Sequence, residues 1–122
     1  VAVFTVSVDP HVRVDVARLM GATLAVNVST EAAREEARRF AGCGLDLVLD
    51  ASGTPSARQA AFDLCRPGGL VVLLGLSQER SEINFVASIR KEHRVAMSFA
   101  YNPIDFERSL ALLRAGEIDL TP

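Results

Sequence analysis

The fold is decided by residues 46–76, DLVLDASGTPSARQAAFDLCRPGGLVVLLGL. An apolar segment at 45–51 predicts a strand, and Thr54-Pro55 then offers the N-cap and the first position of a helix. Pro67-Gly68-Gly69 is expected to stop that helix, and the apolar run at 70–76 predicts the next strand. The expected inner face of the helix consists of Ala57, Ala60, Ala61, Leu64 and Cys65. A strand, a helix and a second strand in this order predict a βαβ unit with parallel strands.

The same alternation continues on both sides of this unit. Strands are expected at 1–6, 24–28 and 94–100, and helices at 10–20 after an Asp9 cap, 31–41 after a Thr30 cap, 85–91, and from Asn102-Pro103 to Gly116. Phe106, Leu110 and Leu113 give the last helix one apolar face. The pattern predicts an α/β fold with a doubly wound, mostly parallel sheet, formed by residues 1–122 as one domain.

The composition excludes several classes of protein. The 122 residues are 49% hydrophobic, with 13 Lys and Arg against 15 Asp and Glu, so neither disorder nor a nucleic-acid partner is indicated. No apolar run reaches the roughly 18 residues that a membrane span needs, and the start lacks the basic region of a signal peptide. We therefore expect a cytoplasmic protein with no membrane partner, in which Cys43 and Cys65 are reduced structural thiols.

Candidate binding loops follow the carboxyl ends of the predicted strands, where open α/β sheets bind ligands. Ser52, Gly53 and Thr54 in ASGTP would suit a ribose or phosphate, although a plain strand-to-helix turn has the same composition. Gly75 would let a flat ring approach the backbone, or it simply ends a strand. Ser98 and Phe99 could line a cofactor pocket, although an aromatic residue at a strand end is more often part of the core.

No catalytic or metal-binding pattern is present in the sequence. His11 and His93 have no partners at zinc-ligand spacing, and no serine lies in a G-x-S-x-G turn. Tyr101 has no lysine four positions later, which excludes the acid pair of a short-chain reductase. The chain itself is expected to bind no metal and to contain no catalytic residue.

Four stretches together resemble the nucleotide-binding domain of the zinc-dependent, medium-chain alcohol and polyol dehydrogenases. They are ARLMGATLAVNV at 17–28, the stretch at 46–76, RKEHRVAMSFAY at 90–101 and DFERSLALLRAGEIDL at 105–120. Their order and spacing carry the resemblance over nearly the whole chain. The resemblance implies that residues 1–122 are a partial dinucleotide-binding domain with a Rossmann-type sheet. It also implies NAD or NADP as cofactor, and hydride transfer between the cofactor and an alcohol or polyol in the parent enzyme, with zinc held by a separate catalytic domain.

The resemblance also implies positions for the cofactor. Ser52, Gly53 and Thr54 would border the adenosine ribose, with Arg13 near it as a basic residue; Leu74, Gly75 and Leu76 would border the nicotinamide ring; the backbone of Ser98, Phe99 and Ala100 would bind the carboxamide. The acidic residue that accepts the ribose hydroxyls of NAD is not clear at the end of strand 1–6, so NAD and NADP stay open. The last strand, near 95–100, would pair two copies in a homo-oligomer.

The sequence departs from this family in three respects. It has no clear acidic residue after the strand at 1–6, it lacks the catalytic domain that holds zinc, and it lacks the opening strand with its glycine-rich loop. The opening strand and its glycine-rich pyrophosphate loop would precede Val1, so we expect this sequence to be a fragment of a longer enzyme. That strand is central in the order 3-2-1-4-5-6, and its absence would leave unpaired edges on the strands at 1–6 and 45–51.

Two other interpretations stay open. DLVLDA, a helix, RPGG and an apolar strand also occur in S-adenosylmethionine-dependent methyltransferases, which would continue with an antiparallel hairpin after the strand at 94–100. Alternatively, the chain is a non-catalytic truncated domain that serves dimerisation.

Overall fold

The computed structural model describes residues 1–5 and 10–121. The chain divides into two compact units, residues 1–34 with 100–122 and residues 35–99. The predicted Asp9 cap lies outside the described residues, and so do Ser7 and Val8, which follow the strand predicted at 1–6.

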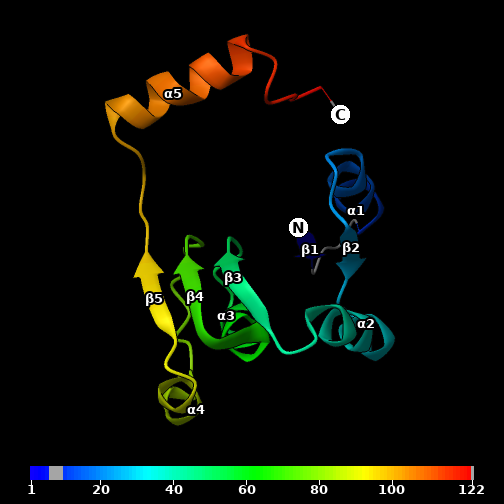
Figure 1. The fold of residues 1–122 in the computed structure, drawn as a ribbon, viewed down its shortest axis with the longest axis vertical. Coiled ribbons are helices and arrows are strands. Elements are labelled where there is room, and N and C mark those ends of the chain that lie inside the picture. Colours follow the sequence, from blue (N-terminus) through cyan, green and yellow to red (C-terminus); the bar gives the residue numbers. More distant parts are fainter. Residues whose placement is uncertain (6–9, 122) are drawn as a thin grey trace. The chain divides into compact units, whose positions relative to one another are not determined.

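The first unit contains a two-stranded parallel sheet of β1 (Ala2–Thr5) and β2 (Leu24–Asn27), connected by α1 (Pro10–Leu19) (Figure 1). Their register runs from Ala2 opposite Leu24 to Thr5 opposite Asn27. Gly21 has φ 87, as expected for a glycine that follows a helix. These elements confirm the strand, helix and strand predicted for this part of the chain.

Helix α2 (Glu31–Ala41) begins and ends where the sequence indicated. The Thr30 hydroxyl caps it by accepting a hydrogen bond from the amide of Ala33 at 3.3 Å. Glu35 and Arg38 form an ion pair at 3.2 Å with i,i+3 spacing on this helix.

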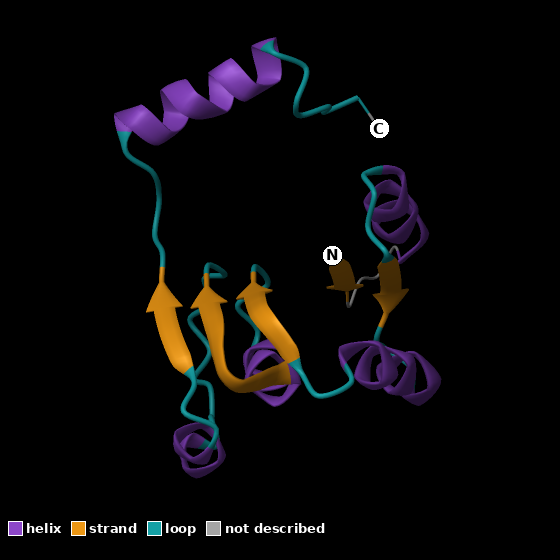
Figure 2. Cartoon of the chain, viewed as in Figure 1, coloured by secondary structure: helices purple, strands orange, loops and turns teal. Residues whose placement is uncertain are grey.

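The second unit contains a three-stranded parallel sheet in the order β3 (Leu45–Asp50), β4 (Cys65–Leu73), β5 (Arg94–Met97). Helix α3 (Pro55–Leu64) connects β3 to β4, and α4 (Phe85–Arg90) precedes β5. The three arrows point the same way, so their carboxyl ends share one edge of the sheet (Figure 2). β1 and β3 belong to different sheets.

The core of this unit lies between α3 and the sheet. Its buried members are Ala61, Phe62, Cys65 and Val71, with Val48, Leu73 and Ile83 packed against them. The predicted inner face of α3 was wrong at two positions: Ala60 is exposed, and Phe62 is buried. Phe62 packs towards the sheet with Ala61 and also lies against the ring of His93, with centroids 6.0 Å apart.

The boundary between α3 and β4 differs from the prediction. The helix ends at Leu64, three residues before Pro67, and β4 begins at Cys65 and includes RPGG. Leu45 pairs with Cys65 but Leu47 pairs with Leu70, so the intervening residues of β4 form a bulge. The regular ladder starts at Leu70, where the sequence placed the strand.

β5 is also shorter than the predicted 94–100. It ends at Met97, the amide of Ser98 donates to the carbonyl of Leu73 at 3.1 Å, and Ala100 has φ 57, which an extended strand does not tolerate. The amide of Asp105 and the side chain of Asn102 then form a capping box for α5 (Pro103–Arg114).

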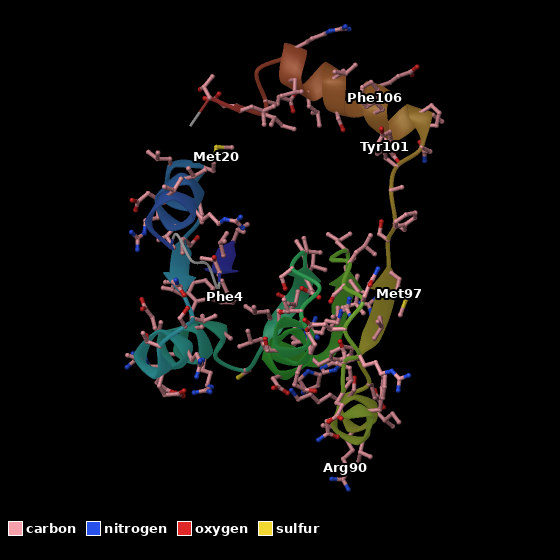
Figure 3. The ribbon with its side chains drawn as sticks, turned by 180° about the vertical axis from the view of Figure 1, so that it is seen from behind. Phe4, Met20, Arg90, Met97, Tyr101 and Phe106 are labelled. Carbon is pink, nitrogen blue, oxygen red and sulfur yellow. The ribbon has the colours of Figure 1, made fainter. Side chains whose placement is uncertain are left out.

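The three apolar residues expected on one face of helix α5 differ in their exposure to solvent. Leu110 and Leu113 are half-buried, whereas Phe106 is exposed. Figure 3 shows Tyr101 beside Phe106, and their rings stack with centroids 5.8 Å apart. In the described part of the chain, no helix is long and apolar enough to cross a membrane.

Candidate functional site

The loop between β3 and α3 is organised by Asp50, the last residue of β3. Asp50 is buried, and its Oδ1 accepts hydrogen bonds from the amides of Ser52 and Gly53 and from the Ser52 hydroxyl, each at 3.0 Å. This arrangement fixes the turn and lets Gly53 adopt φ 73. The predicted residues Ser52 and Gly53 are therefore held by a carboxylate that the sequence analysis did not select.

Thr54 has the predicted capping role. Its hydroxyl accepts a hydrogen bond from the amide of Ala57 at 3.3 Å, and Pro55 follows at the first helical position. Ser52 and Thr54 are thus placed at the start of α3, where helix amides point towards the carboxyl end of the sheet.

The loop after β4 lies directly against the loop after β3. The amides of Leu74 and Gly75 both donate to the carbonyl of Asp50 at 2.8 Å. A Cβ on Gly75 would lie 2.1 Å from the Gly53 nitrogen, and a Cβ on Gly53 would lie 2.6 Å from the Gly75 carbonyl carbon. Glycine is required at both positions because the two backbones contact each other. The sequence interpretations, ligand approach or a plain turn and strand end, did not include this reason.

The side chains beside this contact are open to solvent. Leu74 is 40% exposed and Leu76 is 74% exposed. An apolar surface therefore follows the glycine contact at the carboxyl end of β4, and it can accept the flat face of an aromatic ring.

The segment after β5 completes the edge. Ser98 is held to β4 by its amide, and Phe99 is 79% exposed. Phe99 is therefore not part of the core in this structure, contrary to one of the two interpretations offered for it. The structure brings together Ser52, Gly53, Thr54, Leu74, Gly75, Leu76, Ser98 and Phe99 along one edge of the β3–β4–β5 sheet.

Arg13 and Ala100 belong to the other unit. Arg13 is an exposed residue of α1, and Ala100 begins the segment that leads to α5. These two predicted residues are not assembled with the other eight within one unit.

Arg58 is a second residue that the sequence analysis missed. From the first turn of α3 its guanidinium donates to the Ser81 hydroxyl at 2.9 Å and to the Gly75 carbonyl at 3.1 Å, and its Nε lies 3.7 Å from Asp50 Oδ2. No local pattern in the helix sequence PSARQAAF distinguishes Arg58, because its partners lie in β3 and in the loop after β4.

His93 and Cys65, elsewhere in the second unit, have structural roles. His93 Nδ1 lies 2.9 Å from the Ser88 hydroxyl, and its Nε2 lies 3.2 Å from the Cys65 carbonyl. Burial raises the pKa of the Cys65 thiol, which disfavours the thiolate that metals and electrophiles require. Among residues 1–5 and 10–121, no three His, Cys, Asp or Glu side chains gather to hold a metal ion.

Neither of two hollows of the surface is lined by the candidate loops. One of about 370 Å³ is lined by residues of α1, β2 and the start of α2, including Val14, Arg18 and Asn27. The other, of about 230 Å³, is lined by residues such as Gly42, Pro67 and Lys91. The candidate site is thus an open edge made of loops and not an enclosed hollow.

A family model described as zinc-binding dehydrogenase matches residues 1–115. The chain belongs to the zinc-binding dehydrogenase family. This confirms the family and the Rossmann-type fold class expected from the four stretches. It favours the dehydrogenase over the methyltransferase interpretation, and so does the helix α5, which follows β5 where a methyltransferase would have a hairpin.

Individual relatives in the zinc-binding dehydrogenase family agree with this assignment. A putative D-xylulose reductase of Rhizobium meliloti is 36% identical over 98 residues, which are 80% of this chain and 28% of that protein. An L-threonine 3-dehydrogenase of Saccharopolyspora erythraea is 32% identical over 111 residues, 90% of this chain and 32% of that protein. The chain therefore spans about a third of the length of these relatives.

Solved structures share the fold. An alcohol dehydrogenase of Escherichia coli CFT073, complexed with NADH, has a TM-score of 0.79 and 29% identity, covering 97% of this chain and 34% of its own. A putative zinc-binding dehydrogenase of Sinorhizobium meliloti, bound to NADP, has a TM-score of 0.80 and 27% identity, covering 98% of this chain and 35% of its own.

Proposed function

We propose that this chain is the nicotinamide-dinucleotide-binding part of an NAD(P)-dependent dehydrogenase, whose parent enzyme transfers hydride between an alcohol or polyol and the cofactor. The observation that carries the proposal is the shared edge of β3, β4 and β5, where the loops 52–54 and 74–76 meet through Gly53 and Gly75. The family membership and the similarity to structures that hold NADH and NADP support it.

In this proposal each loop contacts one part of the cofactor. Ser52, Gly53 and Thr54 border the adenosine ribose because their small side chains and the α3 amino terminus allow close approach. Leu74, Gly75 and Leu76 provide the apolar surface for the nicotinamide ring, and Ser98 and Phe99 contact its carboxamide.

The metal chemistry of the proposed parent lies outside the residues described here. Zinc would polarise the alcohol oxygen during hydride transfer, but no three His, Cys, Asp or Glu side chains gather among residues 1–5 and 10–121. His93 is hydrogen-bonded to Ser88 and to the Cys65 carbonyl, and the Cys65 thiol is buried. We therefore assign no zinc ligand and no chemical step to this chain. We also propose a cytoplasmic location, which the free thiols Cys43 and Cys65 support.

Calorimetry with NADH, NADPH and S-adenosylmethionine tests the cofactor class. Leu76→Glu places a negative charge beside the proposed position of the nicotinamide ring and the cofactor phosphates. Leu120→Glu is the control variant, because Leu76 and Leu120 are both 74% exposed. We expect NADH binding by the unmodified chain, weakened about tenfold by Leu76→Glu and unchanged by Leu120→Glu. Binding of S-adenosylmethionine in place of both dinucleotides, or equal effects of the two variants, would contradict the proposal.

A second part of the proposal concerns a homo-oligomer formed through β5. Among the described residues, β4 is the only strand that pairs with β5, so the other edge of β5 has no partner strand there. Val95, Met97 and Phe99 are exposed apolar residues along this segment. An exposed apolar edge strand favours pairing with a second copy. Sedimentation should show a dimer that Met97→Lys or Ala96→Pro converts to a monomer; a mass unaffected by either variant would exclude this interface.

A further inference from the structure

Asp50 and Arg58 form a largely buried pair at the centre of the candidate edge. Their side chains are 2% and 18% exposed, and Asp50 Oδ2 faces Arg58 Nε at 3.7 Å without a hydrogen bond to either atom. The other carboxylate oxygen is fully used by Ser52 and Gly53. Burying two charges is costly, so a pair at this position needs a reason beyond packing.

The contacts of Arg58 indicate that reason. One amino group of the guanidinium donates to the Gly75 carbonyl, and the other donates to the Ser81 hydroxyl. The Gly75 amide donates to the Asp50 carbonyl. Both polar main-chain groups of Gly75 are thereby directed into the protein. With both groups engaged inside the protein, the half-buried Gly75 is better suited to contact an aromatic ring than a polar group.

Arg58 also connects this glycine to the polar segment that follows it. Ser81 lies in the loop between β4 and α4, and the next residue of α3, Gln59, accepts a hydrogen bond from the amide of Asn84 at 3.1 Å. The start of α3 therefore holds the loop at both Ser81 and Asn84. The segment 74–76 is fixed between the Asp50 carbonyl on one side and the Arg58 guanidinium on the other.

We infer that Arg58, oriented by Asp50, is a positioning residue for the nicotinamide half of the cofactor site. This inference rests on the proposed function. Because its guanidinium is engaged by Asp50, Gly75 and Ser81, Arg58 acts through the orientation of residues 74–76 and is not a phosphate ligand.

Three variants separate positioning from stability. Arg58→Gln removes the charge and the forked donor, whereas Arg58→Lys keeps a charge beside Asp50 but cannot donate to Gly75 and Ser81 in the same geometry. Arg66→Gln is the control, since Arg66 lies at the other end of β4 and pairs with Asp46 at 2.6 Å. For each variant, affinities for NADH and for AMP are measured by calorimetry, along with the unfolding midpoint and the backbone amide resonances.

We expect Arg58→Gln to weaken NADH binding about tenfold while AMP binding changes less than about twofold, because AMP lacks the nicotinamide half. Arg58→Lys should restore most of the unfolding midpoint without restoring NADH affinity. The Leu76 amide, which belongs to the same peptide group as the Gly75 carbonyl, should shift in both Arg58 variants and not in Arg66→Gln.

The outcomes distinguish this inference from the proposed function. If the unmodified chain binds NADH and Arg58→Gln leaves that affinity unchanged, or weakens NADH and AMP equally, the positioning role is wrong and the proposed function stands. If the unmodified chain binds neither ligand, the proposed function is wrong and the positioning role is lost with it. In that case, a Leu76 amide resonance that stays unchanged in both Arg58 variants would also contradict the contacts assigned to Arg58.

Discussion

Gly53 and Gly75 touch through their backbones, so closely that a Cβ on Gly75 would lie 2.1 Å from the nitrogen of Gly53. The contact joins the loop after β3 to the loop after β4, and the Asp50 carbonyl reinforces it by accepting both the Leu74 and the Gly75 amides. Two loops that we propose contact opposite ends of one cofactor are therefore parts of one rigid arrangement.

The glycine contact predicts a large cost for a single methyl group. Gly53→Ala and Gly42→Ala both place alanine at positive φ, 73 and 55, but only position 53 has atoms within 4 Å of the added Cβ. We expect Gly42→Ala to lower the free energy of unfolding by about 1 kcal/mol through backbone strain, and Gly53→Ala to lower it by about 3 kcal/mol through strain and overlap together. Urea unfolding measures both, and equal costs would show that the contact does not restrain the loops.

The Asp50–Arg58 pair predicts non-additive substitutions. Asp50→Asn leaves the guanidinium partly buried without its counter-charge, and we expect a loss of about 3 kcal/mol in the free energy of unfolding. Arg58→Gln should add little to Asp50→Asn, because the partner charge is already gone. A double-mutant cycle by urea unfolding checks this coupling; if the two losses simply add, the residues do not act as a pair.

The exposed Asp46–Arg66 pair predicts a pH effect of known sign. The hydrogen bond and charge of Arg66 lower the pKa of Asp46 below its ordinary value. The pair therefore stabilises the folded chain at neutral pH, and this contribution is lost as the pH falls through the folded-state pKa. Carboxyl carbon NMR should show a lowered Asp46 pKa that Arg66→Gln returns to normal, with a smaller shift at high salt. An Asp46 pKa that Arg66→Gln leaves in place would show that another group causes the shift.

The two cysteines predict different reactivity. Cys43 is exposed, whereas Cys65 is buried, its thiol pKa is raised by burial, and its Sγ fills the space beside Gly69. An alkylating reagent should modify Cys43 quickly and Cys65 only when the protein opens. The rate of Cys65 modification should be about tenfold lower for each 1.4 kcal/mol of free energy needed to open the structure around it. Mass spectrometry of timed digests measures the two rates, and comparable rates would mean that the core around Cys65 opens freely.

The sequence was sufficient to predict most of the elements, because their boundaries carry local signals. Thr30, Thr54 and Asn102 each cap a helix where expected, and α2 matches at both ends. The α3–β4 boundary could not be predicted from Pro67 and its glycines, because pairing with β3 extends the strand back to Cys65. Tertiary pairing there outweighs the tendency of glycine and proline to end a strand.

The candidate site was predictable in its loops but not in what holds them. Small residues after β3 and a glycine after β4 indicated a binding edge, yet the reason for both glycines is a long-range contact that no local pattern reveals. Asp50 and Arg58 were missed for the same reason, since each looks like an ordinary polar residue until β3, α3 and the loop after β4 are packed together.

The most direct test of the account is amide chemical-shift mapping of the isotopically labelled chain during titration with NADH. We predict that the amides of Gly53, Leu76 and Ser98 change most and saturate together, because their loops share the carboxyl edge of β3, β4 and β5. Changes confined to Val14 and Asn27, which line the hollow of about 370 Å³ in the first unit, or no changes at all, would contradict the site proposed for this chain.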